Sequence, residues 1–508
     1  MRRFLTGALV LGLALVMGPA AGVSATDGPY GPGSPGLGDP YYPDYGNGGY
    51  DVHDYDLAVT YLPKTDQLWG VATLSVEATQ GLSSFNLDLI GLTVRGVEVD
   101  GVTATWSRTE HELTIVPATP IPDGSAFTVQ VRYDGVPITA YDPFAPDLQI
   151  GFMHTTDGAI VSGEPDVAAF WYPCNDHPRD RATYTFRVTV PERYDVVAIG
   201  LPVGVRGRAG WATHVWRASD PMAAYLATID IGKWVIHSYE TERGLPVIDA
   251  IDPSRRELVE RVLVHQEEVL AFLEDTFGTY PMETAGAIVD DHPGYEFAME
   301  MQTRPVYPSS YFVWGQRSWA LPLVLHELAH MWFGDMVSVD LWRDIWLNEG
   351  FASYAQWLWA EYQGEATPQQ ILEATWDAIP ADDPFWQIVV ADPGAADMFS
   401  GAVYTRGPMT VQALRVEVGD AAFWQIVSAW LDRNAWSTGS TAEFMALAEE
   451  ISGRQLDAFF QTWLFATEKP PAEAVLAVAS RSRVAVAVPT RAVRWVHTWL
   501  RSVEARTR

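Results

Sequence analysis

Cysteine and positive charge are both scarce in this sequence. Cys174 is the only cysteine among 508 residues, so an internal disulfide is excluded and stability must come mainly from core packing. The chain has 33 lysine and arginine residues against 64 aspartate and glutamate residues, which gives a formal net charge of −31. A surface of that charge repels the phosphates of nucleic acids and of anionic lipids, so we expect no nucleic-acid partner.

An apolar run, FLTGALVLGLALVM, stands at the amino terminus behind Arg2 and Arg3 and ahead of the small residues VSA. This run is too short for a membrane anchor, and no stop-transfer pattern follows it. We therefore predict that residues 1–25 are a secretory signal peptide, and that the mature chain is exported and has no transmembrane segment.

The remaining composition is that of a globular protein, with 48% hydrophobic residues, enough for two or three domains with substantial cores. Residues 26–50 are rich in glycine, proline and tyrosine, which predicts an extended lead-in segment. Residues 51–235 alternate apolar and polar positions in short runs such as AFTVQVRY and YTFRVTV, which predicts an antiparallel β domain. The arginine-rich residues 470–508 favour a loosely packed tail over the alternative, a contact for an anionic surface.

Helical periodicity replaces this alternation in the second half of the chain. Residues 252–278 and nearly all of residues 319–467 repeat apolar positions at helical spacing. Residues 285–291 (AGAIVDD) and 298–307 (AMEMQTRPVY) have the composition of strands. The sequence therefore predicts an α+β multidomain fold, in which the antiparallel β domain precedes a mostly helical domain at residues 236–469 with a small sheet.

The motif HELAH places His326 and His330 four residues apart with Glu327 between them. On a helix this spacing puts the two imidazoles about 40° apart and one turn along the axis, so both reach one ion. Glu327 lies about 100° round the helix from His326, which suits contact with a metal-bound water better than ligation. Two hydrogen-bonded core histidines would give the same five letters, so the motif alone only suggests a metal site.

A third ligand follows at a suitable distance along the chain. We expect the first helix to end at Gly334 and a second, aromatic helix to begin near Asp344, with Glu349 in its second turn. This helix–loop–helix brings one carboxylate to the two imidazoles and leaves a fourth position for water, as in catalytic zinc sites. We therefore predict one Zn²⁺ ion bound by His326, His330 and Glu349.

These residues resemble the motifs of the aminopeptidase N family of zinc metallopeptidases, which belong to the gluzincins. HELAHMWFGD, a gap of eighteen residues, and WLNEGFASY carry the resemblance, which extends from about residue 36 to residue 467. The resemblance implies a thermolysin-like catalytic domain at residues 236–469. It also implies a short, secreted, bacterial-type member without the large C-terminal helical domain of longer relatives.

The resemblance also implies how the reaction proceeds. Zinc activates a water molecule, Glu327 acts as the general base, and a tyrosine stabilises the oxyanion. Family members carry this tyrosine at the start of a Tyr-x-Lys-Gly motif, and VYTRGPM places Tyr404 there, with Arg406 in place of the lysine. From the residues alone, Gly407 and Pro408 indicate a helix start, so Tyr404 is expected just ahead of a helix.

Two glutamates are implied as ligands of the substrate's amino group. GYEFAMEMQTRP is similar to the family's Gly-x-Met-Glu-Asn strand, with Glu300 at the amine-binding position. It departs from the family at Phe297 and Met301, where relatives have glycine and asparagine. SGEPDVAAFWYPCNDHP resembles the segment that supplies a second amine-binding residue, here Glu164. By strand alternation Glu296 shares a face with Glu300 and is either a solvated neighbour or a second contact.

We therefore expect a secreted zinc aminopeptidase that hydrolyses the N-terminal residue from peptides with a free N-terminus. A thermolysin-like zinc endopeptidase would need no amine-binding glutamates, and an epoxide hydrolase could use the same site. A catalytically inactive binding module would have lost a ligand or the base, and neither is lost here. Cys174 is expected to be a buried structural thiol, and His177 and His292 are expected to have loop roles. The sequence indicates neither an oligomeric state nor a preferred first residue.

Overall fold

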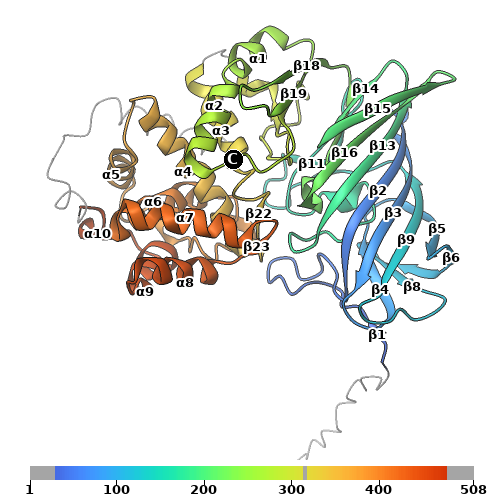
Figure 1. Cartoon of the computed structure of the whole chain (residues 1–508), viewed down its shortest axis with the longest axis horizontal. Helices are drawn as coiled ribbons and strands as arrows, with labels where there is room; N and C mark the ends of the chain where they lie inside the picture. Colours follow the sequence, from blue (N-terminus) through green and yellow to red (C-terminus); the bar gives the residue numbers. More distant parts are fainter. Residues whose placement is uncertain (1–28, 313–316, 477–508) are drawn as a thin grey trace, which may run out of the picture.

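The structure is a computed structural model, and it describes residues 29–312 and 317–476. Figure 1 shows the large β-sheets of the first half on one side of the molecule and most helices of the second half on the other. The predicted α+β fold, with a β part followed by a mostly helical part, is confirmed. The predicted signal peptide and most of the predicted tail lie outside the described residues. Within the part that is described, no helix combines the length and the apolar character needed to cross a membrane.

Three β-sheets build the first half of the chain. Their strands are β1 (Gly31–Pro32), β2 (Tyr50–Leu62), β3 (Gln67–Ala78), β4 (Leu82–Asp88), β5 (Thr93–Val99), β6 (Val102–Thr103), β7 (Thr105–Arg108), β8 (Glu112–Val116), β9 (Ala126–Gly135), β10 (Thr139–Tyr141), β11 (Gln149–His154), β12 (Ala159–Ser162), β13 (Arg181–Pro191), β14 (Asp195–Ala198), β15 (Leu201–Arg208), β16 (Trp211–Ala223) and β17 (Ile229–Gly232).

The largest sheet has eight strands in the order β15-β16-β13-β2-β3-β9-β5-β6. All its neighbouring strands are antiparallel except β13 and β2, which run parallel. Buried and more exposed residues alternate along β2, β3 and β13, so one face of the sheet packs on the core, as the sequence alternation predicts. The other two sheets have the orders β1-β4-β8-β7 and β10-β11-β12-β17-β14.

The second half of the chain combines a small sheet with helices. Its strands are β18 (Val235–Glu240), β19 (Pro246–Ile251), β20 (Ala285–Asp290), β21 (Val306–Pro308), β22 (Val337–Val339) and β23 (Ser437–Gly439). Its α-helices are α1 (Arg256–Leu263), α2 (Gln266–Phe277), α3 (Arg317–Ala329), α4 (Trp346–Tyr362), α5 (Pro368–Ala378), α6 (Gly401–Val418), α7 (Asp420–Asn434), α8 (Thr441–Ser452), α9 (Asp457–Phe460) and α10 (Ala472–Leu476).

The small sheet has the order β18-β19-β20-β21, and only its first pair is antiparallel. Strand β20 is buried along its whole length, as expected for a parallel strand covered on both faces. The predicted helical stretch at residues 252–278 forms α1 and α2, which are separated at Val264 and His265. A separate parallel pair, β22 with β23, ties the loop after α3 to the loop after α7.

The lead-in segment, residues 29–49, packs against both halves of the molecule. It contains only the two-residue strand β1, as its lack of periodicity predicts. The buried carboxylate of Asp39 accepts a hydrogen bond from the backbone N–H of Trp342 at 2.8 Å. The Tyr41 hydroxyl donates to Asp392 at 2.6 Å. The segment therefore links the β part to loops of the helical part.

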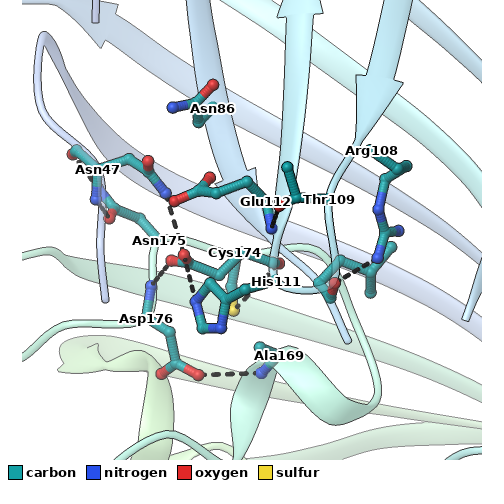
Figure 2. Close-up of polar contacts among 12 residues, drawn as sticks. Asn47, Asn86, Arg108, Thr109, His111, Glu112, Ala169, Cys174, Asn175 and Asp176 are labelled. Atoms are coloured by element: carbon teal, nitrogen blue, oxygen red, sulfur yellow. Dashed lines mark hydrogen bonds and ion pairs between the residues drawn. The ribbon is translucent and has the colours of Figure 1, made fainter. Parts of the chain in front are cut away.

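A buried polar network holds the stretch that follows β12 against the strands (Figure 2). Asp88, the last residue of β4, is fully buried and accepts a hydrogen bond from the backbone N–H of Asp176 at 2.7 Å. The Nε2 atom of His111 lies 2.9 Å from the same carboxyl group. Asp176 in turn accepts a hydrogen bond from the backbone N–H of Ala169 at 3.0 Å. These contacts anchor the loop that carries Glu164.

Candidate active site

The HELAH motif lies on a helix, as predicted, at the end of α3. His326 and Glu327 are within the helix, and His330 directly follows its last residue, Ala329. The predicted helix end at Gly334 is wrong by about one turn, because α3 ends at Ala329. At Gly334 the chain has already left the helix and leads to β22. The N–H of His330 still donates to the carbonyl of His326 at 3.3 Å. The helical spacing of the two imidazoles is therefore preserved, and Gly334 has the positive φ of +138° that glycine tolerates.

Glu349 comes to the two histidines from α4. A short 3₁₀ turn, Trp342–Asp344, precedes α4, which begins at Trp346, so Glu349 lies in the first turn and not in the predicted second turn. The Oε2 atom of Glu349 is 3.0 Å from Nε2 of His326 and 3.5 Å from Nε2 of His330. One ligand atom from each of the three residues lies within 4.8 Å of the others.

The donor set and its surroundings fit a zinc ion. The exposed fractions of His326, His330 and Glu349 are only 2%, 1% and 4%. Nδ1 of His330 lies 3.0 Å from the carbonyl oxygen of Phe333, which leaves Nε2 directed at Glu349. Burial alone would raise the pKa of Glu349, but His330 and the hydrogen bond from His326 outweigh burial and hold that pKa well below its usual value. An ionised carboxylate with two imidazoles is the donor set of catalytic zinc sites.

All seven site residues predicted from the sequence line one cavity of about 270 Å³. Glu327 is 4% exposed, and its carboxylate lies within 4.8 Å of donor atoms of His330 and Glu300. The predicted general base, Glu327, thus lies beside the predicted metal ligands, and its neighbour His326 is one of them. This arrangement agrees with the helical geometry expected from HELAH, because adjacent helix residues point about 100° apart.

Tyr404 reaches the cavity from the first turn of α6. Its ring centroid lies 6.0 Å from that of His326. The expectation that a helix starts at Gly407 and Pro408 is wrong, because α6 begins at Gly401 and contains both residues. Proline inside a helix removes one backbone hydrogen bond, here the bond to the carbonyl of Tyr404. Tertiary packing outweighs that cost and keeps the helix continuous.

The packing partner of this part of α6 is α4. A Cβ atom added to Gly407 would lie only 2.8 Å from the Cα atom of Gly350, so the two glycines allow the helix backbones to touch. Gly350 follows Glu349 in the sequence. The same contact therefore positions Glu349, a predicted zinc ligand, and, one turn earlier on α6, Tyr404.

Arg406 has a structural position and does not line the cavity. Its guanidinium is fully buried and donates to the backbone carbonyls of Trp386, Ile388 and Thr462. Burial lowers its pKa to about 10. The arginine at this position therefore joins two segments, one at residues 386–388 and one at Thr462, and its planar group with several donors suits that role.

Glu300 lines the cavity, but the predicted strand around it is not a regular strand. In residues 298–307 only the end belongs to β21, and Met299 forms a single bridge with Val306. The chain instead turns between Met301 and Arg304, whose N–H donates to the Met301 carbonyl at 2.9 Å. The buried guanidinium of Arg304 donates to backbone carbonyls of neighbouring segments, which holds the turn in place.

The two departures from the family pattern have different positions. Phe297 is partly buried, lines the cavity and packs edge-on against Tyr295, with ring centroids 4.8 Å apart. Met301 is fully buried in the core and does not line the cavity. Glu296 is exposed and lines the cavity, so it is a neighbour of Glu300 on the same wall.

Glu164 comes from the β part, in the loop after β12, and is 8% exposed. One carboxyl oxygen each of Glu164 and Glu300 is buried without a hydrogen-bond partner among the described residues. Burial raises the pKa of both groups, and the charge of Glu300 adds to the rise at Glu164. A cation placed between them would satisfy both oxygens and reverse this rise.

Other residues of the cavity wall carry no sequence signal that identifies them. Tyr42 belongs to the lead-in segment, Asp142 and Asp147 to the loop between β10 and β11, and Asp397 to the loop before α6. Short polar loops of this kind occur throughout the sequence. Only the expectation that the site closes at the boundary between the two halves could have directed attention to them.

The remaining reactive side chains have the structural roles that we expected. Cys174 is fully buried, and burial raises the pKa of its thiol. His292 lies 3.0 Å from the Gln149 side chain, and His177 lies 3.7 Å from Asp39. Neither histidine belongs to a group of metal-ligating side chains within the described part of the chain.

Comparison with known families agrees with this geometry. Residues 52–226 match the peptidase M1 N-terminal domain, and residues 262–463 match the peptidase family M1 domain. Both matches name one class of proteins, the M1 peptidases. The chain belongs to peptidase family M1.

Solved structures of the M1 zinc metallopeptidase from Deinococcus radiodurans are similar to this chain over nearly their whole length. One shares 29% identity at a TM-score of 0.76 and covers 86% of this chain and 98% of that one. A mutant of that protein bound to a Tyr-Ser-Ala substrate gives 29% identity and the same TM-score. Glutamyl aminopeptidase from Bos taurus is 25% identical over 342 residues, which are 62% of this chain and 35% of that protein. This chain thus spans only part of the length of such curated relatives.

Proposed function

We propose that this protein is an exported zinc aminopeptidase that removes N-terminal residues from peptides. One zinc ion is bound by His326, His330 and Glu349. The observation that carries the proposal is the pair of buried glutamates, Glu164 and Glu300, in the same cavity as these ligands. Family membership supports peptide hydrolysis, and the two glutamates support an exopeptidase.

The two glutamates recognise a free ammonium group. Each has a buried carboxyl oxygen without a protein partner, and burial of such an oxygen costs free energy unless it is hydrogen-bonded. An α-ammonium group donates three hydrogen bonds and carries the charge that two adjacent carboxylates require. Glu164 and Glu300 come from different halves of the chain, so amine binding depends on how the halves pack.

The chain's own residues then perform the proton transfers. Zinc, when bound, supplies a Lewis acid that activates water and polarises the scissile carbonyl. Glu327 accepts a proton from the attacking water and delivers it to the leaving amine. The Tyr404 hydroxyl donates a hydrogen bond to the carbonyl oxygen as negative charge develops on it. Both side chains line the cavity beside the ligands.

The relatives support peptide binding but not one choice of first residue. The Deinococcus radiodurans protein binds a Tyr-Ser-Ala substrate, and the Bos taurus relative is a glutamyl aminopeptidase. An acidic first residue would need a cationic partner, and no lysine or arginine is among the described residues that line this cavity. The described lining of the cavity therefore disfavours an acidic first residue.

The decisive experiment compares free and blocked substrates, with and without a chelator. The protein is expected to cleave alanyl and leucyl chromogenic amides and to leave their N-acetylated forms intact. A chelator should abolish cleavage, and added zinc should restore it. Equal cleavage of acetylated and free substrates would contradict the exopeptidase and favour a thermolysin-like endopeptidase. Hydrolysis of an epoxide without any amide cleavage would instead favour the epoxide-hydrolase alternative.

Export is tested on the protein made in a host with a Sec pathway. We expect the chain to leave the cytoplasm and its new N-terminus to lie near Thr26, because VSA precedes that residue. N-terminal sequencing and cell fractionation measure both outcomes. A chain that stays in the cytoplasm with its first residues intact would contradict export.

A further inference from the structure

The lead-in segment reaches the cavity, although the proposed reaction gives this segment no role. Among its described residues, Tyr42 is the one that lines the cavity. We propose that residues 39–45 form a clamp that holds the substrate-binding side of the cavity in place between the two halves. In this clamp Tyr42 is a wall against the bound substrate, and the positioning residues are Asp39, Tyr41 and Tyr45. This inference rests on the proposed function, because it concerns substrate binding in the same cavity.

Asp39 ties the clamp to the turn that leads into α4. Its Oδ1 atom accepts hydrogen bonds from the backbone N–H groups of Tyr41 at 2.8 Å and Tyr42 at 3.2 Å. Its Oδ2 atom accepts a hydrogen bond from the N–H of Trp342, the first residue of the 3₁₀ turn before α4, at 2.8 Å. Burial alone would raise the pKa of Asp39, but these hydrogen bonds and His177 outweigh burial and lower that pKa. An ionised carboxylate thus uses one oxygen for the clamp and the other for the helical half.

Tyr41 ties the clamp to the loop before α6. Its hydroxyl donates a hydrogen bond to the carboxylate of Asp392 at 2.6 Å and accepts one from the backbone N–H of Gly394 at 2.8 Å. Residues 395–400, which follow in this loop, supply part of the cavity wall, and α6 with Tyr404 comes next. One hydroxyl group of the lead-in segment therefore fixes the loop that forms this part of the wall.

Three stacked rings connect the clamp to the buried polar network of the β part. The ring of Tyr42 stacks on Tyr45 with centroids 4.9 Å apart and planes 10° apart, and Tyr45 stacks on His111 at 4.8 Å and 6°. His111 in turn contacts Asp88 at 2.9 Å (Figure 2). The backbone N–H of Tyr45 donates to the Tyr42 carbonyl at 3.1 Å and closes a turn between the first two rings. Because stacked rings contribute free energy beyond the area that they bury, the Tyr42 ring is held in a fixed position at the cavity.

Tyr45 also holds the loop that carries Glu164. Asp166 follows Glu164 by two residues and is buried. Burial raises the pKa of Asp166, and a hydrogen bond from the Tyr45 hydroxyl opposes that rise. One carboxyl oxygen of Glu164 is buried without a hydrogen-bond partner among the described residues, so its position depends on the loop that carries it. The clamp therefore supports one of the two proposed amine ligands through Asp166.

The clamp lies where the two halves have to be held in register. Glu327, Tyr404 and the three proposed zinc ligands all belong to the helical half. Glu164 belongs to the β part and Glu300 to the helical half, so binding of the substrate's amino group depends on how the halves are placed. Loss of a clamp contact should therefore weaken substrate binding more than it slows the chemical step.

Tyr41→Phe tests the clamp, with Tyr50→Phe as a matched control. Each substitution removes a hydroxyl that donates a hydrogen bond of 2.6 Å, but Tyr50 bonds within the β part, to the carbonyl of Asn86. Tyr41→Phe should raise KM for a leucyl chromogenic amide about fivefold and change kcat by less than about twofold. Asp39→Asn should act in the same direction, because an amide offers one acceptor oxygen in place of two. Tyr50→Phe should leave KM unchanged, although thermal unfolding should show that it also loses stability.

Two substitutions of Tyr42 separate the ring from its hydroxyl. Tyr42→Ala removes the stacked ring and the wall, so KM should rise about tenfold. Tyr42→Phe keeps the ring, which makes the stacking contact, and should behave like the wild type. Isothermal titration calorimetry of a leucyl-alanyl-alanine tripeptide with both variants, made in a zinc-loaded Glu327→Gln background, measures the same order of binding without turnover.

The outcomes distinguish this inference from the proposed function. A KM that is unchanged in Tyr41→Phe and Tyr42→Ala would overturn the clamp. A fall in apparent kcat at constant KM would also overturn it, because loss of folded enzyme would explain that result, and so would an equal rise in KM in Tyr50→Phe. Failure of the proposed function would appear as equal cleavage of free and acetylated substrates by the wild type. A rise in KM for the acetylated substrate in the clamp variants would support the clamp even then.

Discussion

The proposed zinc ligands and the proposed amine-binding glutamates line one cavity, but the chain brings them there in different ways. His326, His330 and Glu349 belong to one helix–loop–helix within the helical half. Glu164 and Glu300 come from loops in different parts of the chain, and neither lies in a regular element. The comparison teaches that the candidate metal centre is built from neighbouring segments of the chain, whereas the proposed amine site depends on packing between the two halves.

The largest effect should come from removing the general base. Glu327→Gln keeps the size of the side chain but cannot accept a proton, so we expect kcat to fall about 10³-fold. Zinc content, measured by atomic absorption, should stay near one ion per chain because the three ligands are intact. A rate near that of the wild type would show that another group is the base.

Tyr404→Phe should have the next largest effect. Loss of one oxyanion donor typically costs about 10²-fold in kcat, and KM should change little because the ring remains. Steady-state kinetics on a leucyl amide measure both constants. An increase in KM at unchanged kcat would place Tyr404 in substrate binding and not in stabilising the transition state.

Substitution of Glu164 and Glu300 tests whether the proposed amine site acts independently of the metal centre. Glu164→Gln and Glu300→Gln each remove a charged hydrogen bond, so kcat/KM for free peptides should fall about 10–100-fold while zinc remains bound. Asp123→Asn, an exposed residue outside the cavity, is the control. If zinc is lost together with activity, the metal centre and the amine site are not independent.

Gly407→Ala should disturb the packing of α6 on α4, which holds Tyr404 and Glu349 in position. A Cβ atom there would meet the Gly350 backbone at 2.8 Å, so α6 must shift away from α4. We expect a loss of about 2 kcal/mol in unfolding free energy and a fall in kcat as Tyr404 moves. Gly207→Ala is a matched control, because the nearest atom to its added Cβ is 3.9 Å away. Thermal unfolding of both variants measures the difference.

The smallest effect should come from Glu112 in the buried network of the β part (Figure 2). Burial, with the charge of Asp88, raises the pKa of Glu112 to about 8 from the ordinary value of 4.5. The unfolded chain therefore releases this proton at lower pH than the folded chain. Stability that Glu112 provides is complete below about pH 4.5 and is lost as pH rises towards 8.

Glu112→Gln should remove this pH dependence. At pH 8.5 the variant should be more stable than the wild type by roughly 1 kcal/mol, an amount reduced by the partial solvent exposure of the site. The difference should disappear near pH 4.5, and calorimetric melting curves across this range measure it. Glu110→Gln, an exposed neighbour, should follow the wild type at every pH. A variant less stable than the wild type at pH 8.5 would mean that Glu112 is ionised and bound in the fold.

Errors of the sequence-based prediction occur where tertiary contacts override local preference. Pro408 suggested a helix start, but contact between Gly350 and Gly407 keeps α6 continuous through it. The composition around Glu300 suggested a strand, but the buried side chain of Arg304 stabilises a turn. In both cases a long-range contact supplies more free energy than the local signal.

The sequence by itself determined the α+β order of the chain, and it predicted the proposed zinc ligands and the neighbouring base. These depend on helical spacing and on alternation along strands, which are local properties and can be read from neighbouring residues. Only the tertiary structure decided that Tyr42, Asp142, Asp147 and Asp397 are also among the residues that line the cavity. The physical reason is that loops from both halves come together there through packing of distant segments. Such contacts leave no periodic pattern in the local sequence.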